Sequence, residues 1–167
     1  MNSEYLRGRL GEERLVECLT SWFAVYQTPL AQLERDRLLQ LFEMYRPRVH
    51  TFVEFHEAAR FFFEPPEHFD EKAVAKHLRK GGGFERLPML RNALTDVGRW
   101  EQDSLERAMK ALCEQTGVGL GKFAQPLRIA LSGNAVTPSI YDVLAFIGRE
   151  ETLDRLGACI EHFSIQD

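Results

Sequence analysis

The 167-residue sequence lacks most of the patterns by which membrane proteins and common enzymes are identified. No apolar run approaches the roughly 18 residues of a membrane-spanning helix, and the first residues do not resemble a secretory signal. The metal-binding patterns HExxH and CxxC are missing, as is the GxSxG motif of serine hydrolases. We therefore expect no membrane segment, no zinc site and no catalytic residues in this chain.

Cysteine is scarce as well. Cys18, Cys113 and Cys159 are odd in number, far apart and set in apolar helical patterns, which predicts buried free thiols of a reducing compartment. None of the five histidines has a metal-ligand spacing to a cysteine. We therefore expect structural or surface roles for the histidines and neither a disulfide framework nor a metal site from the cysteines.

One glycine-rich corner has the composition of a phosphate-binding loop but not its spacing. Such a loop places four residues between two glycines and follows the second with Lys-Ser or Lys-Thr. Here three residues separate Gly117 from Gly121, and Phe123 stands at the hydroxyl position after Lys122. No apolar strand precedes the turn, so a corner between two helices is the better interpretation.

Strand patterns are also missing, because no alternation of apolar and polar residues is long enough for a sheet. Apolar residues instead recur every three or four positions, which predicts an all-α protein. Gly98 and Gly117 are predicted to cap helix C-termini, and Thr51 with Glu54 is predicted to form an N-terminal capping box. The predicted helices span 12–27, 30–45, 52–63, 71–80, 87–97, 103–115, 123–131, 138–147 and 150–163.

The segment Glu64-Pro65-Pro66-Glu67 is the best candidate for a boundary between two lobes. Adjacent prolines favour an extended backbone and prevent a helix from continuing. We therefore predict a two-lobed helical protein, with a first lobe at 1–66 and a second at 67–167. The net charge of −4 argues against a general surface for polyanions but allows a local one.

The stretch Gln125–Tyr141 is the most informative part of the sequence. An apolar helix that carries one cation, Arg128, ends at Gly133. A new helix is predicted to start with Thr137 as its N-cap and Pro138 in its first position. The cation and the exposed N–H groups of a helix N-terminus are thereby expected near each other. That arrangement favours reading the edge of a nucleotide base over performing a reaction.

Four groups of residues occur in order along the chain. They are Asn2 with Tyr5-Leu6-Arg7; Arg46-Pro47-Arg48 with Thr51 and Phe55; Gln125-Pro126-Leu127-Arg128 with Ala130-Leu131-Ser132-Gly133; and Thr137-Pro138-Ser139 with Leu144, Ile147-Gly148-Arg149-Glu150, Thr152 and Arg155-Leu156. Together they cover essentially the whole chain and resemble the anticodon-binding region of bacterial glutamyl-tRNA synthetases, which are class I ligases. One such motif would be weak, but the order and family-like spacing of four are specific.

The resemblance implies the tRNA-selecting part of an ATP-dependent ligase that joins glutamate to tRNA(Glu). The catalytic signatures of that family, of the His-x-Gly-His and Lys-Met-Ser-Lys-Ser types, are absent. ATP and Mg²⁺ are therefore expected in a catalytic domain of the same polypeptide, and no cofactor in this chain. The first lobe would contain the end of the stem-contact region and the first anticodon-binding subdomain, and the second lobe the C-terminal subdomain. The implied protein is cytoplasmic, monomeric and independent of membranes.

By the same resemblance, the anticodon loop is contacted by Arg48, Arg128, Thr137, Pro138, Ile140 and Tyr141. Arg48 stands where the family reads the third anticodon base. The glutamate anticodon ends in U-C and the glutamine anticodon in U-G. An arginine only donates hydrogen bonds, so it favours cytosine, which presents acceptors, over guanine, which presents donors. We therefore expect tRNA(Gln) to be rejected. Ser139 and Tyr141 stand where the family often has glycine and phenylalanine.

The residues considered without the resemblance allow other interpretations. Arg48 is then a solvated cation after a helix break, and Arg128 is one half of an internal ion pair. For the whole chain, the alternative is a helical protein-interaction domain derived from a synthetase lobe and without RNA binding, which the acidic composition favours. A row of four cations at helical spacing is either a solvated face or a phosphate contact: Lys72, Lys76, Arg79 and Lys80.

Overall fold

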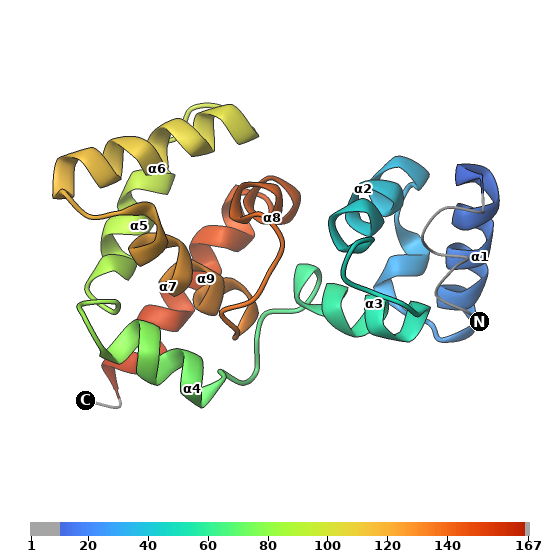
Figure 1. Ribbon diagram of the computed structural model, residues 1–167, viewed down its shortest axis with the longest axis horizontal. Helices are drawn as coiled ribbons and strands as arrows, with labels where there is room; N and C mark the ends of the chain where they lie inside the picture. Colours follow the sequence, from blue (N-terminus) through green and yellow to red (C-terminus); the bar gives the residue numbers. More distant parts are fainter. Residues whose placement is uncertain (1–10, 166–167) are drawn as a thin grey trace. The chain divides into compact units, whose positions relative to one another are not determined.

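The computed structural model describes residues 11–165, and every regular element among them is helical (Figure 1). The predicted all-α class is confirmed. Contacts divide the chain into two compact units, Met1–Phe63 and Glu64–Asp167. The motif formed by Asn2 and Tyr5-Leu6-Arg7 lies outside the described residues.

The first unit is held together by aromatic side chains on three helices. Phe55 is fully buried, and its ring centroid lies 5.8 Å from that of Phe23 and 5.2 Å from that of Phe42. Tilted and edge-to-face pairs of this kind contribute about 0.5–1.5 kcal/mol each beyond the apolar area they bury. The elements of the unit are α1 (Glu12–Val25), the 3₁₀ turn η2 (Pro29–Gln32), α2 (Arg35–Tyr45), α3 (Phe52–Ala59) and the 3₁₀ turn η3 (Arg60–Phe62).

All three helices of the first unit are shorter than predicted, α1 by only two residues at its C-terminal end. The helix expected over 30–45 is broken, because Leu33 and Glu34 have extended backbone with ψ of 139° and 148°. The apolar pattern in the sequence is not interrupted at this break, because Leu30 and Leu38, on either side of it, are both buried. The helix expected to reach Phe63 ends as an α-helix at Ala59 and is followed by η3. Periodicity therefore identified most of the buried side chains but not the backbone breaks, and Tyr26, on the apolar face of the predicted helix 12–27, is 61% exposed.

The start of α3 confirms the predicted N-cap. The Thr51 hydroxyl accepts a hydrogen bond of 3.1 Å from the backbone N–H of Glu54. The Glu54 carboxylate in turn accepts a bond of 2.6 Å from the backbone N–H of His50 rather than from that of Thr51. The reciprocal half of the capping box is thus displaced by one residue, and it fixes the chain close after Arg48.

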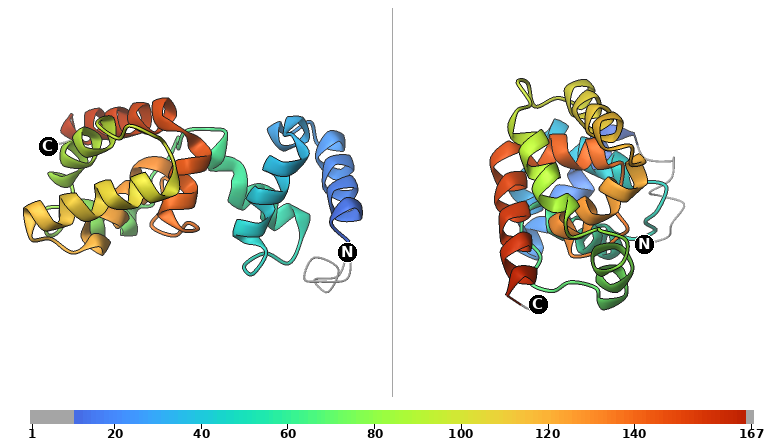
Figure 2. Two further views of the ribbon diagram at one scale, coloured as in Figure 1. Left: turned by 90° about the horizontal axis from the view of Figure 1, so that it is seen from above. Right: turned by 90° about the vertical axis from the view of Figure 1, so that its left-hand side faces the viewer.

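The second unit is built around α7, which contacts α5, α6, α9 and the turn η4 (Figures 1 and 2). Phe123, Leu127 and Leu131 of α7 are fully buried. The helix α8 packs against α6 and α9. The elements are α4 (Glu71–Val74), the π-helical turn η4 (Ala75–Arg79), α5 (Arg86–Thr95), α6 (Gln102–Thr116), α7 (Leu120–Ser132), α8 (Ile140–Ile147) and α9 (Arg149–Ser164).

The helix predicted over 71–80 is not α-helical throughout, since its second half forms the π-helical turn η4. Gly81 and Gly82 follow with φ of +70° and +71°, a conformation that costs other residues about 1–2 kcal/mol. A Cβ on Gly83 would lie 1.7 Å from the carbonyl oxygen of His77. The three glycines therefore form a tight turn that closes the π-helical segment, rather than a simple helix end.

Of the two glycines predicted as helix caps, only one is a cap. Gly117 ends α6 in the left-handed conformation, with φ of +67°. The helix before Gly98 ends already at Thr95, so the prediction for Gly98 is wrong. Its carbonyl oxygen instead accepts a hydrogen bond of 3.0 Å from Arg149 of α9. A side chain remote in sequence thus satisfies a backbone group that the local pattern had assigned to a helix end.

The cysteines are free thiols, but they are not all buried. Cys159 is buried, whereas Cys18 and Cys113 are half-buried, which corrects the prediction for these two. Both lie on amphipathic helices, whose apolar stripe has partly exposed flanks. Burial raises the pKa of Cys159 to about 12, so this thiol is neutral at physiological pH and acts as a small apolar core residue.

The C-terminal end of α7 is held by Arg155, a residue of α9 that is only 3% exposed. Its Nη1 donates a hydrogen bond of 2.8 Å to the backbone carbonyl of Leu131, and its Nε donates one of 2.6 Å to the Glu151 carboxylate. Carbonyl groups in the last turn of a helix lack intrahelical donors, and the helix dipole favours a cation there. Arg155 therefore supplies both a donor and a positive charge to this helix end.

Gly133 makes the sharp turn that follows α7. Its φ is +73°, and the backbone N–H of Asp70 donates a bond of 2.8 Å to its carbonyl oxygen. A Cβ at this position would lie 2.3 Å from the carbonyl oxygen of His68. The chain at the start of the second unit thus lies directly against the bend, and glycine is needed there for both its conformation and its size.

Replacing Gly133 by alanine is expected to lower the free energy of unfolding by about 3 kcal/mol or more, because left-handed strain and a backbone clash add. The matched control is Gly117→Ala, which has a similar φ of +67° but nothing within 4 Å of the added Cβ, and should cost only about 1 kcal/mol. Urea unfolding followed by circular dichroism measures both. Equal losses in the two variants would show that space at Gly133 is not limiting.

Replacing Arg155 by methionine is expected to cost about 1–3 kcal/mol, because the buried Leu131 carbonyl loses its donor while the apolar volume is kept. The control is Glu151→Gln, which should cost less than about 1 kcal/mol, since the Glu151 side chain is 44% exposed. Guanidinium chloride denaturation of the two variants checks this order. A larger loss for Glu151→Gln would mean that the ion pair, and not the bond to the carbonyl, is the stabilising contact.

Candidate functional site

Arg48 lies in the turn that follows α2, and its side chain is exposed. Pro47 cannot continue the helix, and the backbone N–H of Arg48 donates a bond of 2.7 Å to the carbonyl oxygen of Tyr45. The neighbouring cation, Arg46, forms an ion pair of 2.8 Å with Glu43. The turn therefore fixes the backbone at Arg48 and places the guanidinium at the surface of the first unit.

Tyr45 secures this turn from inside. Its hydroxyl donates a hydrogen bond of 2.7 Å to the carbonyl oxygen of Ala58, which ties α2 to α3. Burial raises the pKa of Tyr45 well above its ordinary value, and the nearby positive charge of Arg48 only partly opposes that effect. The hydroxyl therefore remains a donor at every physiological pH.

In the second unit, the half-buried Arg128 of α7 contacts the bend that follows the helix. Its Nε donates a hydrogen bond of 3.0 Å to the Thr137 hydroxyl, and its Nη2 donates one of 3.4 Å to the carbonyl oxygen of Pro138. The predicted closeness of Arg128 to Thr137 and Pro138 is thus confirmed, but the groups that it contacts are a hydroxyl and a carbonyl oxygen rather than the predicted N–H groups of a helix N-terminus. Both acceptors are neutral, so these bonds fix the plane of the guanidinium without neutralising its charge.

Thr137 is not the N-cap of α8, in contrast to the prediction. The helix begins at Ile140 with Ser139 in the cap position, so Pro138 also lies outside it. Threonine and proline are locally favoured at a helix start, but here the bond to Arg128 takes the threonine hydroxyl. Thr137, Pro138 and Ile140 all have buried side chains. The expectation that Ile140 offers a contact surface is therefore wrong, since it is 4% exposed.

The apolar side chain that the bend does expose is Val136, at 76%. The turn before it is organised by side chains, because the Asn134 N–H donates to the Ser132 hydroxyl and the Val136 N–H donates to the Asn134 side chain, both at 3.2 Å. The sequence prediction missed this residue. Its signal was a β-branched apolar residue within a run of small and polar ones, directly before Thr137.

Tyr141 is half-buried in the first turn of α8, which packs against α6. Burial raises the pKa of its phenol, and the nearby Glu106 carboxylate and Cys113 thiol of α6 raise it further. Part of the ring is therefore used in packing between the two helices. Any stacking on a base is restricted to the part of the ring that remains exposed.

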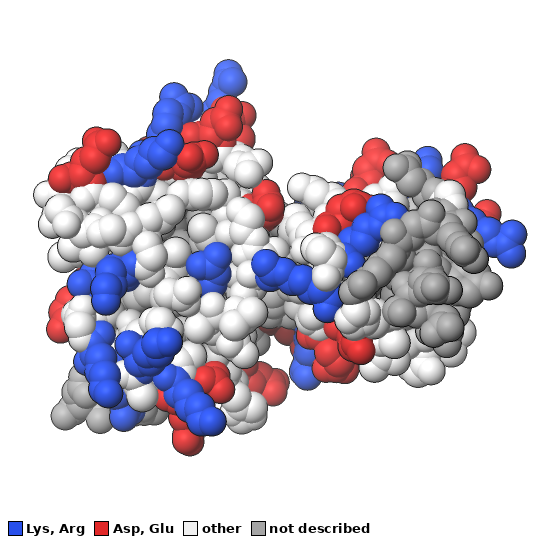
Figure 3. All heavy atoms as spheres, in the orientation of Figure 1, with Lys and Arg blue, Asp and Glu red and all other residues white. Residues whose placement is uncertain are grey.

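The four cations predicted to share one face are all exposed, on α4, on η4 and in the residue after it. Figure 3 shows Lys and Arg side chains gathered over the part of the second unit where Figure 1 draws α4. Asp70 accepts a bond of 2.7 Å from the Ala73 N–H and lies at the edge of this face, at the start of α4. The predicted exposure of this row is confirmed for Lys72, Lys76, Arg79 and Lys80.

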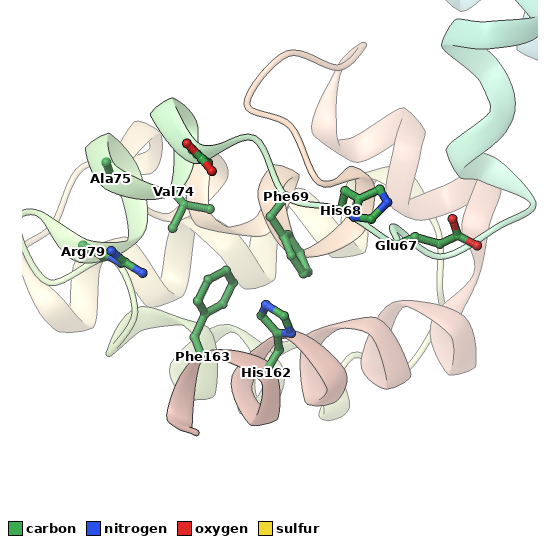
Figure 4. Close-up of a pocket in the computed structure, with 9 residues that line it drawn as sticks. Glu67, His68, Phe69, Val74, Ala75, Arg79, His162 and Phe163 are labelled. Carbon is green, nitrogen blue, oxygen red and sulfur yellow. The ribbon is translucent and has the colours of Figure 1, made fainter. Parts of the chain in front are cut away.

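A cavity of about 480 Å³ lies between the start of the second unit, η4 and the end of α9 (Figure 4). Figure 4 places Arg79 at one end and Glu67 at the other, with His162 and Phe163 pointing toward Phe69. The Phe69 ring lies 5.0 Å from His162 and 5.1 Å from Phe163. The lining is thus mainly a set of rings packed on one another, flanked by charges of both signs.

Two kinds of feature were searched for in the described part of the chain and not found there. Among residues 11–165, no three His, Cys, Asp or Glu side chains lie close enough to share a metal ion. Within the same range, no helix is both long enough and apolar enough to cross a bilayer. Around Arg128, the described groups are hydrogen-bond donors and acceptors beside the exposed side chain of Val136.

Comparison with known proteins agrees with this description. A family model described as "Anticodon binding domain" matches residues 14–160. A glutamate–tRNA ligase from Desulforudis audaxviator is 34% identical over 165 residues, which cover 96% of this chain and 33% of the relative. One from Magnetococcus marinus is 39% identical over 117 residues, covering 70% of this chain and 25% of the relative. The chain thus spans at most about a third of the length of these curated relatives.

Solved structures give the same result. The crystal structure of a glutamate tRNA ligase from Elizabethkingia meningosepticum in complex with its amino acid matches with a TM-score of 0.83 and 26% identity, over 96% of this chain and 31% of that one. A glutamate-tRNA synthetase from Elizabethkingia anophelis matches with a TM-score of 0.79 and 25% identity. The resemblance drawn from the ordered motifs is therefore confirmed, and the chain belongs to the anticodon-binding domain family, with glutamate–tRNA ligases as its relatives.

Proposed function

We propose that this chain is the anticodon-binding part of a glutamate–tRNA ligase and selects tRNA(Glu) by its anticodon. The observation that carries the proposal is the family match over residues 14–160, supported by relatives that are glutamate–tRNA ligases. Arg48 in the first unit and Arg128 in the second are the proposed readers of the anticodon loop. The first unit then corresponds to the end of the stem-contact region and the first anticodon-binding subdomain, and the second unit to the C-terminal subdomain.

Arg48 is proposed to read the third anticodon base. Its exposed guanidinium is a set of donors on a turn that Tyr45 holds in place. The acceptors of cytosine pair with such donors, whereas guanine presents donors of its own on the same edge. The mismatch costs about 1–3 kcal/mol, which favours the glutamate anticodon over that of glutamine.

Arg128 is proposed to contact a second part of the loop from α7. Thr137 and Pro138 hold its guanidinium by hydrogen bonds of 3.0 and 3.4 Å, so in this proposal they position the reader and do not meet the RNA through their buried side chains. Val136 and the exposed part of Tyr141 offer apolar surface on which an unstacked base can rest. Ile140 supports this region from the core.

The remaining parts of the proposal concern the whole ligase. ATP and Mg²⁺ are held by a catalytic domain of the same polypeptide, which transfers glutamate in the cytoplasm as a monomer, and this chain contributes selection through differential binding. The alternative function is a protein-interaction domain without RNA binding. The observation that favours it is the net charge of −4, which opposes unspecific attraction of RNA.

The substitution Arg48→Gln is expected to lower discrimination between anticodon stem-loops that end in U-C and U-G. Glutamine presents both a donor and an acceptor, so the ratio of the two dissociation constants should fall toward one from about 5- to 150-fold. Fluorescence anisotropy at a fixed low salt concentration measures both constants. The control is Arg46→Gln in the same turn, whose arginine is paired with Glu43 and should leave the ratio unchanged.

Three outcomes of that measurement count against parts of the proposal. Equal affinity of the unmodified chain for the two stem-loops would remove the discrimination. An unchanged ratio in Arg48→Gln would show that another residue reads the third base. No binding of either stem-loop, and none by the full-length ligase, would favour the protein-interaction alternative.

The substitution Thr137→Val is expected to weaken binding of the U-C stem-loop about tenfold, because the guanidinium of Arg128 loses the acceptor that orients it. Thr137→Ser keeps the hydroxyl and should restore most of the affinity. In an Arg128→Gln background, Thr137→Val should have little further effect, because the Thr137 hydroxyl then has no guanidinium to orient. The double-mutant cycle formed by these variants measures the coupling between the two side chains. An additive loss in that background would mean that Thr137 acts independently of Arg128.

A further inference from the structure

The net charge of −4 conceals a segment of opposite sign in the second unit. Between Lys72 and Phe84 the sequence contains four Lys or Arg residues and no Asp or Glu. This segment forms most of α4, all of η4 and the glycine turn that follows. Figure 3 shows the resulting gathering of Lys and Arg side chains over the part of the second unit where Figure 1 draws α4, with Asp and Glu side chains beside it.

A fifth cation joins this surface from a distant part of the sequence. Lys122 lies in the first turn of α7, which contacts η4. Burial lowers the pKa of His77 in η4, and the charges of Lys76 and Lys122 lower it further, which agrees with the contact between α7 and η4. We use the name basic patch for Lys72, Lys76, Arg79, Lys80 and Lys122.

The basic patch is not explained by folding. All five side chains are exposed, and none of the ion pairs found within residues 11–165 uses any of them. Lys122 also stands at the positive end of the α7 dipole, in a first turn without an acidic residue, where a cation is unfavourable. Uncompensated like charges of this kind cost stability, and residues that break a local rule in this way tend to serve function.

The two segments that carry the basic patch are held in a fixed arrangement. Arg86 donates a hydrogen bond of 2.7 Å from Nη1 to the carbonyl oxygen of Gly81, and its guanidinium lies 6.0 Å from the centroid of the Phe123 ring, next to Lys122 in sequence. The backbone N–H of Phe84 donates a bond of 3.0 Å to the carbonyl oxygen of Leu78. The backbone beneath the lysines is thus ordered before any ligand arrives, which lowers the entropic cost of binding.

We propose that the basic patch binds phosphate groups of the tRNA backbone, separately from the reading of the anticodon by Arg48 and Arg128. The inference rests on the proposed function, because that function supplies the RNA. Lysine is a point charge with freely turning donors, which suits a phosphate whose exact position varies. Such contacts set the position of the RNA and add affinity without regard to base identity, whereas contacts to base edges specify the sequence.

The test is the salt dependence of tRNA(Glu) binding by the variant Lys76→Gln/Lys122→Gln, which removes one cation from each segment. Each lost phosphate contact should reduce the slope of log Kd against log salt concentration by about 0.7–0.9. The ratio of the Kd of the variant to that of the unmodified chain should therefore fall by about threefold per lysine when salt is raised from roughly 50 to 200 mM. The matched control, Arg99→Gln/Arg107→Gln, removes the same charge beside and on α6, which Figure 1 draws on the opposite side of the unit from α4. It should leave the slope nearly unchanged.

Two further readouts separate this role from a structural one and from anticodon reading. The thermal unfolding midpoint of Lys76→Gln/Lys122→Gln should be unchanged or higher, because repulsion is relieved. The ratio of affinities for U-C and U-G stem-loops should also be unchanged. A lower midpoint with an unaltered salt slope would assign the lysines to folding and overturn the proposal.

The failures of the two proposals are distinguishable. If the unmodified chain binds and discriminates tRNA but Lys76→Gln/Lys122→Gln behaves like the control, only the basic patch is refuted. If the unmodified chain and the full-length ligase bind no tRNA, the proposed function fails and the phosphate contact with it. The variant can also be tested for binding to phosphatidylserine vesicles. If loss of the two lysines abolishes vesicle binding but leaves RNA binding unaffected, the basic patch binds a membrane surface and the proposed RNA site is refuted.

Discussion

The hydrogen bond from Arg155 to the Leu131 carbonyl stabilises the last turn of α7, and the geometry of the second unit around Arg128 depends on that turn. Arg128 lies one turn before Leu131, and the bend that carries Thr137 begins just after it at Gly133. Were the last turn of α7 to fray, the Thr137 hydroxyl could not meet the Arg128 guanidinium at 3.0 Å. Burying an arginine is costly, and the bonds to Leu131 and Glu151 offset part of that cost.

Much of this fold could be predicted from the sequence because its determinants are local. The three-and-four spacing identified side chains that are buried, such as Leu41 and Phe55, since one face of a helix must meet the core. Gly117 and Gly133 were identifiable because few residues other than glycine adopt a left-handed backbone at a helix end. The N-cap at Thr51 follows from a bond within one helical turn. In each case the residue and its partner lie within a few positions of each other.

What could not be predicted depends on partners remote in sequence. Local preference assigned Thr137 to a helix start, but its hydroxyl accepts from Arg128 on another helix, and this bond outweighs the capping preference. Gly98 looked like a cap, yet Arg149 of α9 satisfies its carbonyl. The sequence pattern around the π-helical turn η4 is that of a regular α-helix. One additional residue per turn hardly changes the spacing of the exposed lysines, so the pattern does not distinguish the two. Exposure and side-chain partners therefore had to come from the structure.

The cations of the second unit fall into two physical classes with different consequences for recognition. Arg128 is held by bonds to neutral oxygen atoms, and Arg155 by the Leu131 carbonyl oxygen and the Glu151 carboxylate, so the planes of both are fixed and their donors have a defined direction. The lysines of the basic patch are exposed and unpaired with any described carboxylate, so they attract negative charge from any direction. Added salt strongly weakens the attraction of these exposed lysines for negative charge. It weakens short, directed hydrogen bonds much less. In the proposed complex, rising ionic strength therefore removes affinity before it removes selectivity, because the two depend on different residues.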